Sequence, residues 1–302
     1  MISIIISSQN DYVLNELRKN VDVTIGVPYE VIAIENKNGK MGICEAYNKG
    51  AASAKCDILC FMHEDISFET TNWGKNALAH LSDLSVGLIG VAGGDTKSIV
   101  PSSWSSSIFQ SEISIIQHFK DKSKAPKRII KTGYPDNQSV IKNVVCLDGV
   151  WLCTRKDVFE KYQFDNKTFT GFHGYDVDFS LQIFQQYRVC VVFDILLNHY
   201  SSGNYNQQWI ENIIKISKKW KNELPITVRD LSKQEFVRQH WTTMGGFLRR
   251  LTLLKYPFTT RLKFLLRYSF NRFFQPLHFL HFLKLIISNS FDKEEAENSL
   301  SS

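Results

Sequence analysis

The chain of 302 residues has little proline and glycine and lacks long apolar runs. Seven Pro and 16 Gly exclude a low-complexity chain, and no internal repeat with a period of roughly 20 to 50 residues is found. Because no run of about 18 apolar residues occurs, no helix is expected to span a bilayer. Residues 1–8 carry no basic segment and turn polar after six positions, so we expect a strand there and not a signal peptide.

The cysteines form no CxxC pair and lie mostly inside apolar runs. This pattern is typical of reduced thiols in the core of a cytosolic protein, and it disfavours a structural zinc site, which needs closely spaced ligands. The six cysteines are Cys44, Cys56, Cys60, Cys146, Cys153 and Cys190.

Hydrophobic residues make up 43% of the chain and charged residues 22%, enough for a sizeable core. The charge is unevenly distributed. Residues 236–291 contain nine Lys or Arg and no Asp or Glu, which leaves −3 for the rest of a chain whose total is +6. The same stretch holds ten of the 21 Phe. Aromatic residues mixed with cations favour an anionic membrane surface and make a nucleic-acid partner the weakest interpretation.

In the first part of the chain, short β-branched runs alternate with helical patterns. The order strand, helix, strand, helix, strand predicts an α/β protein with a parallel sheet and crossover helices. Polar residues follow each strand, and ligands of such sheets bind at the carboxyl ends of the strands, so we expect one crevice there. The expected elements are strand 2–7, helix 12–20, strand 30–34, helix 42–54 and strand 58–62.

The rest of the chain is expected to form two further parts. Residues 93–143 are Ser-rich and Lys-rich and predict loops with short antiparallel strands. Prolines then divide the tail into three helices. We predict one unit over residues 1–224 and a helical tail over 225–302. The expected elements are strands 144–147, 150–152 and 189–193, and helices 177–186, 209–220, 233–254, 259–274 and 277–289.

His63, Glu64 and Asp65 directly follow the buried strand 58–62. Polar groups are costly to bury without partners. A divalent cation that bridges a diphosphate needs one or two carboxylates and takes its other ligands from phosphate and water, which this cluster could supply. A solvated turn after a strand is the alternative.

At this point the chain resembles the nucleotide-sugar half of a family 2 glycosyltransferase with the GT-A fold. The resemblance rests on the strand ends 7–10 and 35–36, the helix 42–50 and residues 61–65. It implies a mixed, mostly parallel sheet flanked by helices, a nucleotide-diphosphate sugar donor and Mn²⁺ or Mg²⁺. The family's Asp-x-Asp element is here His63-Glu64-Asp65.

By the same resemblance, Asp65 is the implied metal ligand and Glu35 matches the acidic residue that contacts the nucleoside. Ser7 lies where the first strand ends near the base. His63 stands in place of the Asp that usually contacts the ribose, which puts that contact in doubt. His199 resembles a C-terminal His that completes the metal and diphosphate shell, although a lone His is usually structural.

The second half extends the resemblance through residues 147–151, 154–159 and 172–179. In the family a Glu-Asp pair opens a helix here, and the Asp is the general base for the acceptor hydroxyl. Tyr175 replaces that Glu, and Asp176 keeps the Asp, which implies that Asp176 is the base. Alternatively, Asp176 is a helix N-terminal residue stabilised by the dipole. Asp178 is expected to orient the helix and not to react.

Three residues are assigned to the acceptor side: Asp148, Trp151 and His173. Trp151 is expected to stack on an acceptor sugar, with a core Trp as the alternative. Trp209 and Trp220 lie at helical spacing and are expected to be core residues.

These observations predict an inverting, metal-dependent glycosyltransferase of the bacterial cell-surface polysaccharide type. It would act on a glycan or lipid-linked acceptor at the cytoplasmic face of the membrane, held there by residues 236–291. A helical subdomain packed on the body or on a partner is the alternative for the tail. Two alternative functions are a nucleotidyltransferase, which would need a Gly-rich basic loop that residues 7–11 lack, and a catalytically inactive glycan-binding or membrane scaffold.

Overall fold

The computed structural model describes residues 1–105, 111–119, 127–131, 139–201 and 205–289. Its centre is a seven-stranded sheet in which five strands run in one direction, while β12 and β10 run in the other. This is the mixed, mostly parallel sheet that the sequence predicts. In spatial order the strands are β10 (Ile141–Val144), β13 (Arg188–Val192), β5 (Val86–Gly90), β12 (Trp151–Arg155), β3 (Ile58–Met62), β1 (Ile2–Ser8) and β2 (Tyr29–Glu35).

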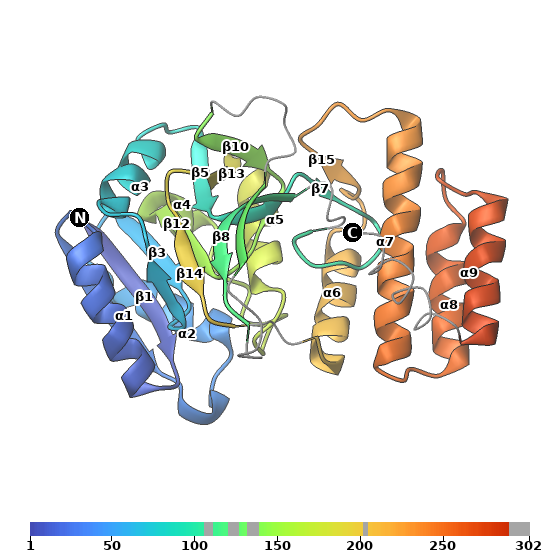
Figure 1. The fold of residues 1–302 in the computed structure, drawn as a ribbon, viewed down its shortest axis with the longest axis horizontal. Helices are drawn as coiled ribbons and strands as arrows, with labels where there is room; N and C mark the ends of the chain where they lie inside the picture. The colour runs from blue at the N-terminus through green and yellow to red at the C-terminus, as the bar shows by residue number, and fades with distance from the viewer. Residues whose placement is uncertain (106–110, 120–126, 132–138, 202–204, 290–302) are drawn as a thin grey trace.

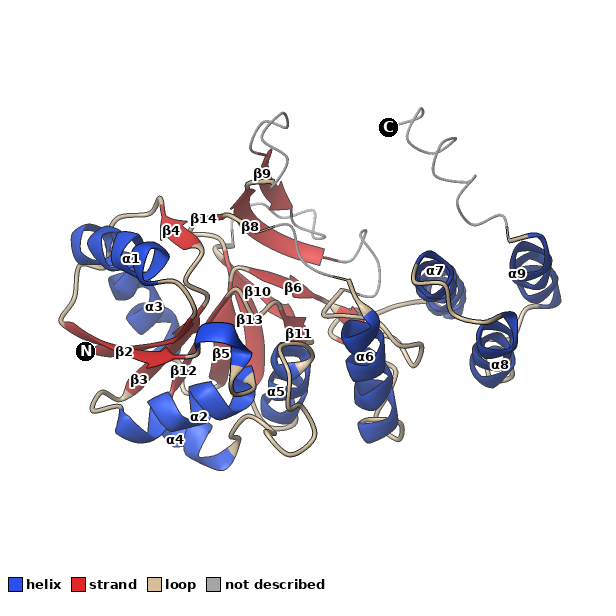
Figure 2. Ribbon diagram, turned by 90° about the horizontal axis from the view of Figure 1, so that it is seen from below, coloured by secondary structure: helices blue, strands red, loops and turns tan. Residues whose placement is uncertain are grey.

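Helices cover both faces of this sheet (Figure 2). The strands alternate their side chains between two apolar cores, one under each helical layer. The helices on one face are α1 (Asp11–Thr24) and α3 (Trp73–Leu81), and those on the other are α2 (Ile43–Ser53), α4 (Lys156–Lys161) and α5 (Tyr175–Phe184). Helix α3 and strand β5 were not among the expected elements, whereas α1, α2 and α5 confirm predicted helices within a few residues.

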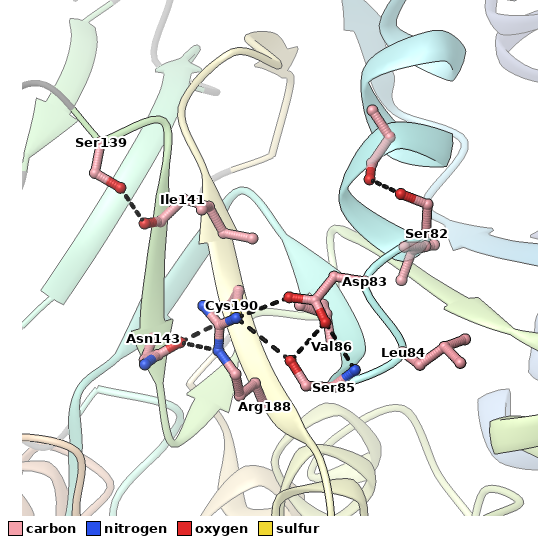
Figure 3. A network of polar contacts seen from close by, with 12 residues as sticks. Ser82, Asp83, Leu84, Ser85, Val86, Ser139, Ile141, Asn143, Arg188 and Cys190 are labelled. Carbon is pink, nitrogen blue, oxygen red and sulfur yellow. Dashed lines mark hydrogen bonds and ion pairs between the residues drawn. The ribbon is translucent and has the colours of Figure 1, made fainter.

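A polar network fixes the sheet edge at the start of β5 and β13 (Figure 3). The Arg188 guanidinium donates to Asn143 Oδ1 on β10 (2.9 Å) and to Asp83 Oδ2 before β5 (3.1 Å). Asp83 also accepts from the Ser85 backbone N–H and hydroxyl. These contacts lie at the amino ends of β5 and β13. The carboxyl ends of the strands are therefore available for the functional site.

A second sheet lies over the carboxyl ends of the main strands. It confirms the short antiparallel strands predicted within 93–143, and it includes three short strands from other parts of the chain. Its strands are β11 (Cys146–Leu147), β6 (Ala92–Gly94), β8 (Ser111–Gln117), β14 (Leu197–His199) and β4 (Ile66–Phe68), with β9 (Lys127–Lys131) paired to β8. Because β14 pairs with both β4 and β8, this sheet brings the segments around 65, 117 and 199 together.

The C-terminal part forms a helical bundle at one end of the molecule (Figure 1). Helices α7 (Lys233–Leu253), α8 (Phe258–Ser269) and α9 (Pro276–Ser288) begin and end close to the predicted breaks at Pro257 and Pro276. They share an apolar core with α6 (Gln207–Lys219) of the body. Within the described part of the chain, no helix combines the length and hydropathy needed to cross a bilayer.

Two polar links reinforce this junction. Strand β15 (Ile226–Thr227) pairs with β7 (Thr96–Lys97), and Arg229 donates to the buried Asp95 carboxylate at 3.2 Å. Removing one partner of a buried ion pair leaves a charge without compensation. The bundle is therefore attached to the body through a shared core, a short sheet and an ion pair.

Candidate active site

A cavity of about 810 Å³ opens at the carboxyl ends of the central strands, where the topology places a ligand site. Seven of the nine residues singled out from the sequence line it, and they come from five separate segments of the chain. They are Ser7, His63, Asp65, Asp148, His173, Asp176 and His199. The predicted convergence of the strand ends on one crevice is confirmed for β1 and β3.

His63, Asp65 and His199 bring one ligand atom each to within 4.8 Å of one another. Asp65 Oδ1 lies 3.9 Å from His63 Nδ1 and 4.0 Å from His199 Nε2. His199 Nε2 is buried and has no hydrogen-bond partner among the residues that the structure describes. A buried nitrogen without a partner is costly, and a cation at this point would satisfy it.

Tyr175 sets the protonation of the His63 ring. Its hydroxyl lies 3.0 Å from the Gly149 carbonyl, which can only accept, so the hydroxyl donates there. The same oxygen lies 2.9 Å from His63 Nε2 and must accept from it. His63 therefore carries its proton on Nε2 and presents the lone pair of Nδ1 towards Asp65. Burial also lowers the His63 pKa, which keeps the ring neutral.

Gln117 does the same for His199. Its amide nitrogen donates to backbone carbonyls of His118 (2.8 Å), His199 (3.2 Å) and Ser201. The amide oxygen is thereby turned to His199 Nδ1 at 3.3 Å, and His199 donates from that atom. The lone pair of Nε2 is then free for a cation. Both imidazoles are therefore held in the tautomer that a metal ligand needs, so the residues present fit a divalent cation.

Asp176 lies on the same cavity wall as Asp148, in the first turn of α5. Burial, reinforced by the nearby Asp148 charge, raises the Asp176 pKa to about 7. Hydrogen bonds from backbone N–H groups lower the Asp176 pKa and so offset part of this rise. One of them is donated by the Gly149 N–H to Asp176 Oδ2 at 3.2 Å. A carboxylate with a pKa near neutrality can accept a proton in the transition state and release it afterwards.

Asp178 has a different role, although it is only two residues away. It is 1% exposed and accepts from Lys219 Nζ (2.9 Å), Trp220 Nε1 (2.8 Å) and Gln182 Nε2 (2.9 Å). These contacts join α5 to the end of α6. Asp178 orients the helix that carries Asp176, as the sequence predicts.

Glu64 and Asn36 hold the loops next to the cavity. The sequence placed Glu64 in the candidate cation cluster and assigned Asn36 no role. Glu64 accepts from the Ser8 hydroxyl (2.8 Å) and from the backbone N–H groups of Gln9 and Asn10. Asn36 donates to Ser7 Oγ at 3.1 Å. Their partners lie up to 56 residues away, so a local pattern carried no signal for these contacts.

Two of the expected site residues, Trp151 and Glu35, are not among the described residues that line the cavity. The stacking of Trp151 on an acceptor is wrong: the side chain is fully buried, and its ring packs edge-on against Trp73 and Phe68 in the core beneath α1 and α3. Glu35 ends β2 with its side chain 74% exposed, 3.9 Å from Lys37 Nζ, and is not among the described residues that line the cavity. Its contact with a nucleoside stays a prediction.

The aromatic surface of the cavity comes from other residues. Phe172 is exposed and packs 5.4 Å from the His63 ring. Tyr205 is 53% exposed and meets Trp209 edge-on at 5.0 Å, while Arg250 of α7 lies 4.5 Å from the Tyr205 ring centroid. Trp209 is a buried residue, as expected, but it also lines the cavity. The bundle thus supports one wall of the site.

Two solved structures share the fold. The chain superposes on the crystal structure of GalNAc-T7 with UDP, GalNAc and Mn²⁺ at 12% identity and a TM-score of 0.50, covering 96% of this chain but only 58% of that one. It superposes on the mannosyltransferase PcManGT from Pyrobaculum calidifontis in complex with GDP-Man and Mn²⁺ at 11% identity and a TM-score of 0.51, covering 96% and 80%.

Family and sequence comparisons complete this picture. No curated protein matches the chain in sequence. The family model described as glycosyltransferase like family matches residues 3–226, which include every residue named above that lines the cavity. That match covers most of the chain, and the fold agrees with it. The chain therefore belongs to the glycosyltransferase-like family and has the GT-A fold.

Proposed function

We propose that the protein transfers a sugar from a nucleoside diphosphate sugar to a hydroxyl group, with inversion at the anomeric carbon. The observation that carries this proposal is the pairing, in one cavity, of Asp176 with the cluster of His63, Asp65 and His199. Asp176 removes the proton of the acceptor hydroxyl as that oxygen attacks the anomeric carbon. The bond to the diphosphate breaks in the same step, so one displacement inverts the centre.

His63, Asp65 and His199 would hold a divalent cation. Bound there, it would neutralise the charge that develops on the leaving diphosphate. Two imidazole nitrogens favour Mn²⁺ over Mg²⁺, which prefers oxygen ligands. The similar structures of GalNAc-T7 and PcManGT contain Mn²⁺ and a nucleotide, which supports the same ligand class here.

Thermal stabilisation by a panel of nucleoside diphosphates and nucleotide sugars, with Mn²⁺, with Mg²⁺ and without metal, tests this proposal. A ligand that binds only the folded state raises its stability. We expect a Mn²⁺-dependent increase with one nucleotide, followed by transfer of the matching sugar. Binding of the nucleotide sugar without turnover on any acceptor would favour the inactive glycan-binding or scaffold function instead.

We also propose that the acceptor is a lipid-linked or cell-surface glycan of a bacterial cell, met at the cytoplasmic face of the membrane. The bundle exposes cations together with large apolar side chains, the composition of helices that lie on anionic lipid. The exposed apolar residues of the bundle, among those described, are Leu253, Phe258, Leu266, Phe270, Phe274, Leu277, Leu280 and Ile287.

A further inference from the structure

A fully buried lysine, Lys97, supports the wall of the active-site cavity from behind. It ends β7, and it is not among the described residues that line the cavity. Its Nζ donates to three oxygens of the segment that follows: the Ser102 carbonyl (2.6 Å), the Ser102 hydroxyl (2.7 Å) and the Ser103 carbonyl (3.0 Å). An ammonium group has three N–H donors, so these contacts use all of them.

The three acceptors of Lys97 are neutral oxygens. Burial lowers the Lys97 pKa to about 8, so the side chain is mainly protonated near neutral pH and keeps its three donors. A cation buried among neutral acceptors costs stability that an apolar side chain of similar length would not cost. What Lys97 supplies in return is geometry, because three donors on one atom fix the path of residues 102 and 103.

The segment that Lys97 holds forms part of the cavity wall. Ser103 and Trp104 line the cavity together with Asp148 and Asp176. Trp104 is partly buried, because it also packs against the core beneath α2, α4 and α5. Its carbonyl oxygen lies so close to Gly94 on β6 that a Cβ added at residue 94 would lie 2.2 Å from it. Trp104 is thus fixed by this close approach and by the hydrogen bonds of Lys97 to the two preceding residues.

The topology places this wall on the acceptor side of the cavity. Strand β6 follows β5 along the chain and pairs with β11, which directly precedes Asp148. In the main sheet, β12 and β3 lie between β5 and β1, the strand whose end carries Ser7. Lys97 also lies near enough to Asp176 for their charges to interact. Trp104 therefore belongs with the proposed base and not with the nucleotide end of the cavity.

We propose that Lys97 is a positioning residue that holds Trp104 on the acceptor side of the cavity, where the Trp104 ring contacts the acceptor sugar. This inference rests on the proposed transfer to a hydroxyl acceptor, and it deepens that function by naming a residue that determines how the acceptor binds. Lys97 itself touches no substrate. Without it, residues 102 and 103 lose three hydrogen bonds, and the Trp104 ring no longer has one fixed orientation.

Acceptor and donor KM values, measured separately in Lys97→Met, Trp104→Ala and the double variant, test this role. The donor is the nucleotide sugar that gives thermal stabilisation, and the acceptors are a panel of p-nitrophenyl glycosides. Each single variant should raise the acceptor KM by about three- to tenfold and leave the donor KM unchanged. The double variant should be no worse than Trp104→Ala, because Lys97 acts through that ring. Additive losses, or a higher donor KM in Lys97→Met, would overturn the proposal.

Hydrogen–deuterium exchange of the full chain tests the hold of Lys97 without any turnover. In Lys97→Met, the backbone of residues 102–104 should exchange about tenfold faster, whereas the segments around Asp65 and His199 should not change. Lys142→Met is the matched control, since it removes another buried lysine, on the outermost strand β10, that is not among the described residues lining the cavity. Equal effects of the two variants on exchange and on the acceptor KM would leave Lys97 with a role in stability alone.

A milder variant decides the case in which circular dichroism and melting temperature show that Lys97→Met does not fold. Ser102→Ala removes one of the three acceptors and keeps the lysine, and it should raise the acceptor KM about twofold. An unchanged acceptor KM in this folded variant would contradict the role of Lys97. If the wild type transfers sugar to no acceptor, the proposed function is wrong, and the acceptor contact of Trp104 is wrong with it. An active wild type with unchanged exchange in Lys97→Met contradicts only the positioning role.

Discussion

The active-site cavity and the C-terminal bundle of α7, α8 and α9 differ in the charges that they carry. The cavity collects Asp65, Asp148 and Asp176 together with imidazoles, and it suits a cation and a hydroxyl that must lose a proton. The bundle carries an excess of cations, since residues 236–291 contain nine Lys or Arg and no Asp or Glu. The cavity lies mainly on the core beneath α2, α4 and α5, and its lining residues Trp209 and Ile213 belong to the core of the bundle. Catalysis and attachment should therefore respond independently to substitution, which the following variants test.

Asp176→Asn is expected to have the largest effect. It removes the proton acceptor but keeps the shape of the side chain, so kcat should fall about a thousandfold. Binding of the nucleotide sugar and of anionic vesicles should not change. Steady-state kinetics with thermal stabilisation measure both effects, and the exposed Asp157→Asn is the matched control. Full activity in Asp176→Asn would remove Asp176 from the role of base.

Tyr175→Phe should weaken Mn²⁺ binding by about ten- to a hundredfold, because the phenol hydroxyl sets the His63 tautomer. The expected signature is a higher Mn²⁺ concentration for half-maximal activity with kcat largely restored at saturating metal. Tyr162→Phe, a hydroxyl loss on α4's C-terminal side, serves as the control. If kcat falls and the metal requirement does not change, Tyr175 acts on the substrate and not through His63.

The pH dependence should distinguish the two regions in a single experiment. Burial raises the Asp176 pKa to about 7, and only the ionised carboxylate accepts a proton. Therefore kcat/KM should be level above that pH and fall about tenfold per pH unit below it. Vesicle binding by the bundle does not depend on the Asp176 carboxylate and should show no such loss. A value of kcat/KM that stays constant between roughly pH 5 and pH 8 would contradict the role of Asp176 as the general base.

The comparison also shows how far the sequence could predict the site. Residues that directly follow buried strands, such as His63 and Asp65, are placed by topology, because parallel strands end at one edge. The proline breaks likewise predicted the start of α8 and both bounds of α9, whereas α8 ends at Ser269 and not at residue 274 as expected. Trp151 was misassigned because the chain around Asp148 turns before β12 begins, and the Trp side chain then falls on the core face.

The supporting residues could not be found in this way. Gln117 contacts His199 across 82 residues, and Tyr175 reaches His63 across 112. Nothing local distinguishes these side chains from other polar residues. In the sequence, Tyr175 stands out only because it replaces the Glu of the family. In the structure its hydroxyl lies so close to Gly149 that a Cβ added at residue 149 would lie 2.0 Å from the hydroxyl oxygen. A contact of this kind depends on the completed fold.

Tyr205 is the point where the two regions meet, and it should give the smallest effect. Its exposed ring lines the cavity, and Arg250 of α7 lies 4.5 Å from it and 5.1 Å from the Trp209 ring. Stacking of an acceptor sugar on an aromatic ring is worth about a factor of three to ten, so Tyr205→Ala should raise the acceptor KM by that factor and leave the donor KM unchanged.

Arg250→Met, which keeps the length of the side chain without its charge, should reproduce part of that change, because the cation holds the Tyr205 ring in place. Acceptor and donor KM values are measured separately for both variants, and Lys215→Met on the exposed side of α6 is the control. If Tyr205→Ala changes the acceptor KM and Arg250→Met does not, the bundle contributes nothing to the acceptor site. Catalysis by the body and membrane attachment by the bundle would then be independent of each other. If both variants raise the acceptor KM, α7 is the element through which a membrane-bound bundle positions the acceptor.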